Sequence, residues 1–369
     1  MEKLIRCGLA GLLYLFVCVA GAGILQAATL DELIQGARKE RELSVMMPGT
    51  MTPEVVKALE SAMNKAYGTN INIKYVAAGN YIKAAAIAVT EHRTGTTPTF
   101  DATIGYDANV IAMLDAGALE GIDNWRELAP KGTPVNDKSI SPAVLKNGAF
   151  KFVDNYHIMI YNSKLVSRAD LPKRLADLGN PKYKGKFALP PYIDILCQGM
   201  LVYDREKLLD IYRSWGKNEP KLQGPKDAID RVVLGEIWFT SGPNDYDYFM
   251  RRATGDPVGL AFFQDIVQWT PVYMAVRAKA SSPNAAKLWV MFNAGPEAQR
   301  IWEKELLWMN NSYAQSRGKE IKQSIQDSGA KIVSWLDNDE AVKMMQWVQT
   351  TKEGEAYASR VRTAIMEGR

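Results

Sequence analysis

The chain has 369 residues, of which 47% are hydrophobic and 23% are charged, and this balance excludes wholesale disorder and fibrous repeats. One hydrophobic core rarely serves a chain of this length, so two domains are expected. The formal net charge is only +4, which argues against nucleic-acid binding. Two His and three Cys leave few ligands for a zinc centre and few bases for catalysis.

The N-terminal segment has the pattern of an export signal. Lys3 and Arg6 precede an apolar run that closes in small residues, as in secretory signal peptides. We expect residues 1–28 to be removed after about Ala27 or Ala28, which would place the mature protein in the periplasm. An uncleaved membrane anchor is the alternative, and the small residues favour cleavage. Cys197 would then be the only cysteine left, with no internal disulfide.

The first part of the mature chain alternates helices with strands. Thr52 and Pro53 form a typical helix start, and Gly68 a typical end. We expect helices around 30–37 and over 53–67, 80–90 and 108–116, and strands over 42–47, 70–77 and 100–105. This rhythm predicts βαβ units and a mainly parallel sheet.

The pattern breaks over 121–148, where prolines lie among polar residues, and then returns. We expect further strands over 156–161, 186–189, 236–240, 258–263 and 271–276. Helices are expected over 194–215, 225–234, from 283, over 296–306 and within 338–366. This order predicts two α/β lobes joined by irregular crossings.

Three motifs in this order carry a family resemblance. They are Tyr161-Asn162 with Leu165, then Pro181-Lys182-Tyr183-Lys184-Gly185-Lys186, and later Pro283-Asn284 followed by Gly295-Pro296-Glu297. The chain resembles the bacterial extracellular solute-binding proteins, the periplasmic receptors of ABC importers, and within them the ferric-iron-type subgroup. Leu175 stands near a place where that pattern usually has Trp.

The resemblance implies a two-lobe, periplasmic-binding-protein-like fold of type II, in which each lobe is a doubly wound, mostly parallel sheet flanked by helices. The N-terminal lobe would comprise 29–150 and 272–320, the C-terminal lobe 151–271, and residues 321–369 would form helices packed on the lobes. The protein would act as a monomer without a cofactor. It would capture a small solute between the lobes, close around it and deliver it to an ABC permease in the inner membrane.

Candidate ligand contacts lie in loops that follow strands, because helix N-termini there offer amide groups and ligands bind at the carboxyl ends of such strands. Tyr106 is the leading candidate. Thr52 and Asp194 fit helix caps better than ligand contacts, and Gly79-Asn80 fits a plain turn equally well. The predicted set is Thr50, Gly79, Asn80, Tyr106, Asp107, Tyr192, Ser241, Asn244, Tyr246 and Asp265.

The ligand is harder to predict. Ferric receptors of the resembled subgroup usually present adjacent tyrosines, and this chain has no Tyr-Tyr pair, so we expect no metal site. Helix N-termini favour a small organic anion, whereas the acidic candidates would suit a cation such as a polyamine. Ferric iron and a secreted enzyme on the same scaffold remain alternatives. We expect no enzyme, since no G-x-S-x-G, H-E-x-x-H or phosphate-binding loop occurs.

Overall fold

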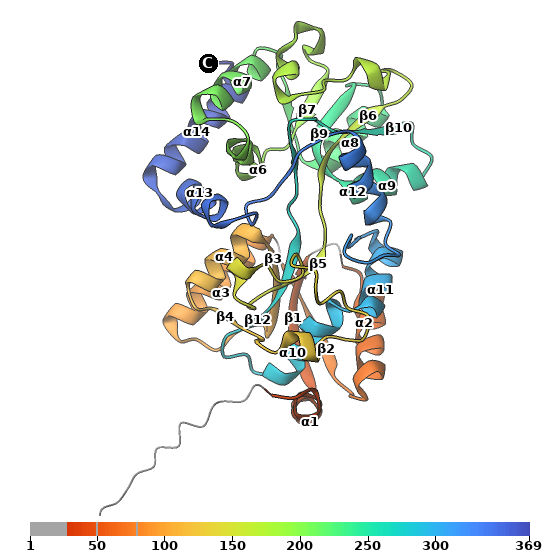
Figure 1. Cartoon of the computed structure of the whole chain (residues 1–369), viewed down its shortest axis with the longest axis vertical. Coiled ribbons are helices and arrows are strands. Elements are labelled where there is room, and N and C mark those ends of the chain that lie inside the picture. The colour runs from red at the N-terminus through yellow and green to blue at the C-terminus, as the bar shows by residue number, and fades with distance from the viewer. Residues whose placement is uncertain (1–27, 49–50, 79) are drawn as a thin grey trace, which may run out of the picture.

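The computed structural model describes residues 28–48, 51–78 and 80–369, which form two lobes stacked along the long axis of the molecule (Figure 1). Nearly all of the predicted export signal lies outside the described residues, and so do Thr50 and Gly79. Within the described ranges, no helix combines the length and the apolar character that crossing a membrane requires.

The lower lobe in Figure 1 is built on one sheet, in the order β2-β1-β3-β12-β4, with β5 also paired to β12. Its strands are β1 (Glu42–Pro48), β2 (Asn72–Ala78), β3 (Ala102–Tyr106), β4 (Leu119–Glu120), β5 (Phe150–Val153) and β12 (Val272–Arg277). Its helices are α1 (Leu30–Glu40), α2 (Pro53–Tyr67), α3 (Tyr81–Thr94), α4 (Asp107–Asp115), α5 (Trp125–Leu128), α10 (Pro283–Asn293) and α11 (Pro296–Leu306).

The upper lobe holds a second sheet, in the order β10-β6-β9-β7-β8. Its strands are β6 (His157–Asn162), β7 (Phe187–Leu189), β8 (Lys221–Leu222), β9 (Phe239–Asn244) and β10 (Val258–Ala261), and a separate pair joins β11 (Val267–Gln268) to β13 (Ile332–Val333). The helices of this half are α6 (Ile193–Cys197), α7 (Arg205–Gly216), α8 (Pro225–Val233), α9 (Asp245–Ala253), α12 (Gly318–Asp327), α13 (Asp339–Thr350) and α14 (Lys352–Glu367).

Both sheets are mixed, whereas the sequence pattern predicts mainly parallel pairing. β1 runs parallel to β2 and β3, but β12 runs antiparallel to β3, β4 and β5. In the upper sheet, β6 is antiparallel to β9 and β10. The reversed strands β6 and β12 are those that follow a crossing from the other lobe. A strand that enters a sheet from the opposite end runs against its neighbours, and the βαβ rhythm carries no sign of this.

The helix expected over 194–215 divides into α6 and α7, and the N-cap of α6 is Tyr192 rather than Asp194. The ends of α2 follow their sequence signals closely. Thr52 caps α2, with its hydroxyl accepting from the Val55 amide, and Gly68 ends the helix in the left-handed region at φ 60°. Most of α12 lies within 321–369, where helices are expected, but the same stretch also holds the short strand β13.

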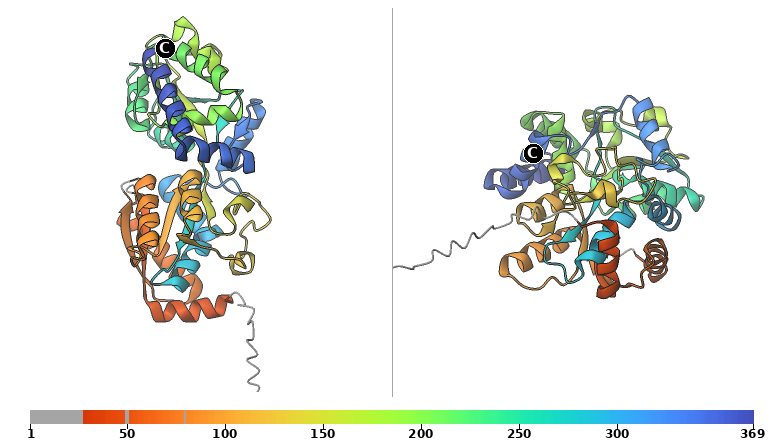
Figure 2. Two further views of the ribbon diagram at one scale, coloured as in Figure 1. Left: turned by 90° about the vertical axis from the view of Figure 1, so that its left-hand side faces the viewer. Right: turned by 60° about the horizontal axis from the view of Figure 1, so that its bottom comes forward.

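Three segments connect the lobes, and we call them the crossing segments: residues 154–156, 269–271 and 307–317. The first two touch through an isolated antiparallel bridge between Tyr156 and Trp269. The narrow waist that these segments form is visible from the side (Figure 2).

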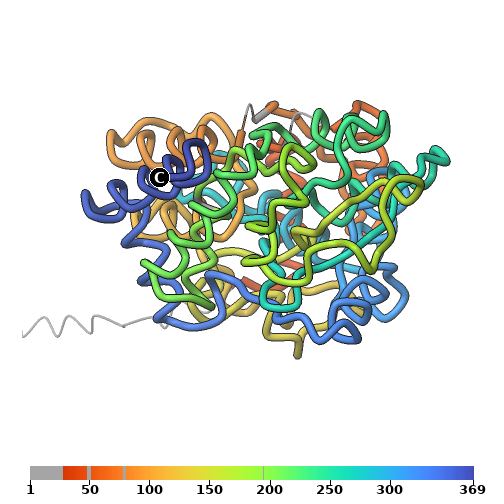
Figure 3. The backbone as a smooth tube through the Cα atoms, turned by 90° about the horizontal axis from the view of Figure 1, so that it is seen from above, coloured from red at the N-terminus to blue at the C-terminus, as the bar shows by residue number. Residues whose placement is uncertain are grey.

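The C-terminal helices lie on the side of the molecule where α3 and α4 lie, as the view from above shows (Figure 3). α14 packs along α7 and against α13. α13 also reaches the lower lobe, since Gln346 Nε2 donates to Asp115 Oδ2 of α4 over 2.7 Å. The two lobes therefore meet at a point away from the crossing segments.

Candidate functional site

Two tyrosines of the lower lobe stand at neighbouring helix starts. Tyr81 opens α3, directly after Asn80, whose side-chain oxygen caps the helix by accepting from the Lys83 amide over 2.7 Å. Tyr106 ends β3 and precedes α4. The two rings meet edge to face, with centroids 4.6 Å apart. The strand-to-helix geometry thus brings both aromatic rings to one edge of the sheet.

A third tyrosine reaches this place from the upper lobe. Tyr246 belongs to α9 but packs against the lower lobe's core, with its ring 6.4 Å from that of Trp308. Asn244 Nδ2 donates to the Tyr246 hydroxyl over 3.1 Å. We call Tyr81, Tyr106 and Tyr246 the interlobe aromatic cluster, because its members come from both lobes.

The tyrosines influence one another electrostatically. Burial raises the pKa of Tyr106 well above its usual value, and Tyr81, Tyr192, Asp247 and Asp107 raise it further. Burial raises the pKa of Tyr81 as well, with a contribution from Tyr246. Tyr192, which is 45% exposed at the start of α6, thus stands near the cluster on its solvent side. The phenol groups stay neutral over the physiological pH range.

Acidic side chains accompany the cluster. Asp247 Oδ2 accepts from the Asn244 amide over 3.0 Å, and burial raises the pKa of Asp247 to about 6 against the lowering effects of that bond and of Arg251. Asp245 is 1% exposed, and burial raises its pKa to about 8. Asp107 is buried at the start of α4, where its Oδ1 accepts from the Ala108 amide over 2.8 Å.

Two buried acceptor oxygens beside Tyr246 have no hydrogen-bond donor among the described residues: Asn244 Oδ1 and Asp245 Oδ2. The other oxygen of Asp245 accepts from the Tyr156 amide over 3.3 Å. A buried acceptor without a donor is costly, so Asn244 Oδ1 is suited to a ligand group that brings an N–H or O–H donor.

His157 lies just behind the site as a structural residue. Its Nδ1 pairs with the Gly242 carbonyl oxygen and its Nε2 with Thr270 Oγ1, both over 2.8 Å. Burial lowers its pKa to about 4, so the ring is neutral. Its two bonds tie β6 to β9 and to a crossing segment.

The remaining predicted residues lie apart from the cluster or act locally. Ser241 pairs with Met159 within the upper sheet. Asp265 accepts from the Leu175 amide at 2.9 Å and from the Tyr203 hydroxyl at 2.5 Å, so its carboxylate fixes a loop of its own lobe.

The predicted set omits three residues that the structure brings to this place: Tyr81, Asp247 and Trp308. Tyr81 and Asp247 each lie within three residues of a predicted contact, so the loop positions carry the signal. Trp308 belongs to a crossing segment that shows no motif. Tyr248 does not join Tyr246 in this cluster, because it packs into a different cluster with Ile158 and Phe262.

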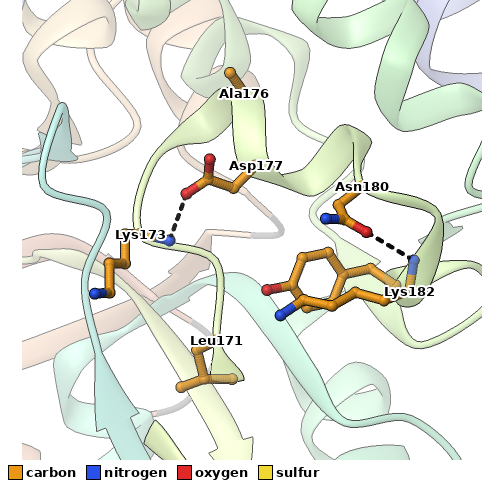
Figure 4. Close-up of a pocket in the computed structure, with 7 residues that line it drawn as sticks. Leu171, Lys173, Ala176, Asp177, Asn180 and Lys182 are labelled. Carbon is orange, nitrogen blue, oxygen red and sulfur yellow. Dashed lines mark hydrogen bonds between the residues drawn. The ribbon is translucent and has the colours of Figure 1, made fainter. Parts of the chain in front are cut away.

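A separate pocket of about 370 Å³ lies on the surface of the upper lobe (Figure 4). Asp177 accepts there from the Lys173 amide over 2.9 Å, and Asn180 from the Lys182 amide over 3.0 Å. These polar groups bond to their own loop, in the stretch that carries the Pro181–Lys186 motif. In the part of the chain that the structure describes, no group of three or more His, Cys, Asp or Glu side chains could hold a metal ion.

Comparison with known proteins identifies the family. Residues 55–353 match the bacterial extracellular solute-binding proteins. The chain belongs to this family. A search of curated proteins gave no match. The family resemblance noted in the sequence is thus confirmed over most of the chain.

Solved structures of similar proteins share the fold of this chain. Iron-bound HitA from Pseudomonas aeruginosa superimposes with a TM-score of 0.66 at 17% identity, over 88% of this chain and 99% of that chain. A substrate-binding protein of an ABC transporter from Agrobacterium tumefaciens gives 0.64 at 14% identity, over 89% and 97%. PotD, a spermidine/putrescine ABC transporter protein from Streptococcus pneumoniae, gives 0.63 at 13% identity, over 89% and 100%. The predicted two-lobe, periplasmic-binding-protein-like fold of type II is confirmed.

Proposed function

We propose that this solute-binding protein is the periplasmic receptor of an ABC importer, that it binds a small organic cation between its lobes, and that it delivers this solute to an inner-membrane permease. Family membership supports the binding role, and the similar solved structures include substrate-binding proteins of ABC transporters. Hinge closure of two lobes around a ligand is a common mechanism of capture. The export signal predicted for residues 1–28 fits this location.

The acidic groups around the interlobe aromatic cluster are the reason for proposing a cationic ligand. Among the charged groups that shift the pKa values of Tyr81, Tyr106, Tyr246 and Asp247, the acidic ones are Asp107, Asp245 and Asp247, and Arg251 is the single basic one in the described chain. Arg251 is itself ion-paired with Asp230 and Asp256. Tyrosine faces and carboxylates attract an ammonium group and repel an anion.

The sequence alone favours an organic anion, on the ground that helix N-termini face the cleft. Those N-termini exist here, but the first turn of α9 already carries Asp245 and Asp247. A carboxylate ligand would meet these two side chains before it met the amides. An ammonium ligand would instead supply a donor to Asn244 Oδ1, and its charge would favour loss of the proton that buried Asp245 holds at neutral pH. The side chains therefore favour the polyamine-like alternative.

Ferric iron is a second candidate, because tyrosine hydroxyls from both lobes stand close to one another. The raised pKa values of Tyr106 and Tyr246 work against this candidate, since Fe³⁺ binds the deprotonated phenolate. Iron binding would also give a visible phenolate-to-iron absorption band, which an organic cation does not.

The proposal is tested by titrating the protein with spermidine, ferric citrate and citrate, followed by calorimetry and by absorption. We expect heat and thermal stabilisation with spermidine, and neither with citrate. Asp247→Asn should weaken spermidine binding by at least about tenfold, as removal of a desolvated charge partner usually does. Because the pKa of Asp247 is about 6, affinity should also fall as the pH drops below 6 and the carboxylate takes up a proton.

Asp210→Asn is the matched control, since Asp210 is an exposed carboxylate of the same lobe, 73% accessible and ion-paired with Arg213. It should bind spermidine like the wild type. If the protein binds citrate and not spermidine, the ligand is an organic anion and the proposal of a cation is wrong. An absorption band with ferric citrate would show that the ligand is ferric iron. Turnover of a bound solute would revive the enzyme alternative.

A further inference from the structure

One carboxylate joins all three crossing segments. Asp154 Oδ1 accepts from Trp269 Nε1, and Asp154 Oδ2 accepts from the Asn311 amide, each over 2.7 Å. The Asp154 amide in turn donates to the Met309 carbonyl oxygen over 2.8 Å. Asp154 lies in the first segment, Trp269 in the second, and Met309 and Asn311 in the third.

The negative charge of Asp154 is balanced by a lysine of β5 in the lower lobe. Lys151 Nζ lies 3.0 and 3.1 Å from the two carboxylate oxygens, and both side chains are fully buried. The same ammonium lies 5.3 Å from the centre of the Trp269 ring, which adds a cation–π contact. With four bonds to its two oxygens, the Asp154 carboxylate is fully committed to the waist of the molecule.

Further bonds hold the segments together around this ion pair. The Thr270 amide donates to the Asn155 carbonyl oxygen over 2.9 Å, and Asn311 Nδ2 donates to the Tyr156 hydroxyl. The bonds form one buried network, and a buried network is held as a unit because each lost partner leaves another group unsatisfied.

We infer that Asp154, paired with Lys151, is a positioning residue that makes the three crossing segments act as one pivot when the lobes close. The inference rests on the proposed closure around a ligand. Without the pair, each segment could open and bend separately. The ligand itself touches neither residue in this proposal; the pair acts through the segments that carry Tyr156, Trp269 and Asn311.

A second buried ion pair provides a matched comparison. Arg277 Nη2 lies 3.1 Å from Glu91 Oε2, with side-chain exposures of 0% and 11%. This pair joins β12 to α3 inside the lower lobe. A variant of Glu91 therefore disturbs a buried charge without touching the crossing segments.

The test uses the ligand-free protein and hydrogen exchange measured peptide by peptide. Asp154→Asn should accelerate exchange in all three crossing segments by at least about tenfold, and should increase the radius of gyration measured by small-angle X-ray scattering. Glu91→Gln should accelerate exchange in β12 and α3 and leave the crossing segments and the radius unchanged. Equal acceleration in both variants would overturn the inference.

If Asp154→Asn does not fold, Trp269→Phe tests the same coupling between the crossing segments. This change removes one donor to Asp154 Oδ1 and keeps an aromatic ring near Lys151. We expect faster exchange at the Asn311 amide, which Trp269 does not bond, because the coupling passes through the carboxylate. Unchanged exchange at Asn311 would overturn the inference. Because the exchange experiment contains no ligand, it tests this inference even if the protein does not bind spermidine.

Discussion

Among single side chains, Asp245 links the candidate site to the pH dependence of stability. Its carboxyl is buried, and its pKa rises from 3.8 to about 8 because burial penalises the charged form. The folded protein therefore keeps a proton that the unfolded chain releases. The stabilising contribution is complete below pH 3.8 and is lost as the pH rises through 8.

Asp245→Asn should remove this dependence. The variant should gain stability relative to wild type on going from pH 5 to pH 8.5, by an amount on the order of a few kcal/mol. His157 and Asp247 titrate in both proteins, so their contributions cancel in the difference. Thermal unfolding of both proteins at the two pH values measures the effect. An equal difference at both pH values would contradict the buried, protonated carboxyl.

The sequence locates the candidate site by loops rather than by individual contacts. Tyr106 and Asn244 end β3 and β9, Tyr246 follows β9, and the structure brings all three to the interlobe region. Asp265 also follows a strand, but its carboxylate bonds within its own lobe. Position after a strand is a local property, whereas the direction of a side chain depends on tertiary packing that periodicity does not contain.

Between elements, the packing of α14 on α7 depends on a residue without a side chain. Gly216 ends α7, and a Cβ there would collide with the Ala364 carbonyl oxygen and the Gly368 backbone of the C-terminal end. The two helices can approach this closely only because Gly216 leaves the space. Sequence patterns place the glycine at a helix end, but they do not reveal the partner helix.

Gly216→Ala should destabilise the protein by about 1–3 kcal/mol, the usual effect of overpacking. Alanine is the better helix former, so a loss must come from the contact with α14. Gly224→Ala is the control, because nothing lies within 4 Å of a Cβ at that position. Gly224 is the N-cap of α8, where alanine is disfavoured, so this variant should lose less than about 1 kcal/mol. Chemical denaturation measures both. A neutral Gly216→Ala would mean that α14 moves aside freely.

In the whole molecule, α13 provides a contact between the lobes that the crossing segments do not. Its Gln346 is half-buried and donates to the exposed Asp115 of α4. Opening of the lobes would separate α13 from α4 and break this bond. The bond therefore favours the closed arrangement without adding to the contacts of the ligand.

Gln346→Ala should speed the dissociation of bound spermidine by about two- to tenfold, the range set by one hydrogen bond, and leave association nearly unchanged. Gln349→Ala, at an exposed position of the same helix, is the control and should match wild type. Stopped-flow measurement with spermidine separates the two rates. A slower association with unchanged dissociation would show that α13 does not hold the closed form.

The number of segments at the waist also limits the kinds of motion open to the molecule. Two bodies joined by a single strand can swivel about that strand, whereas three neighbouring tethers fastened to one carboxylate resist swivelling and leave a bend about one line. The lobes then keep a fixed rotational alignment in the open and the closed form. A membrane partner would therefore bind one of two defined shapes of this protein. The empty and the loaded molecule would differ only in the angle between the lobes.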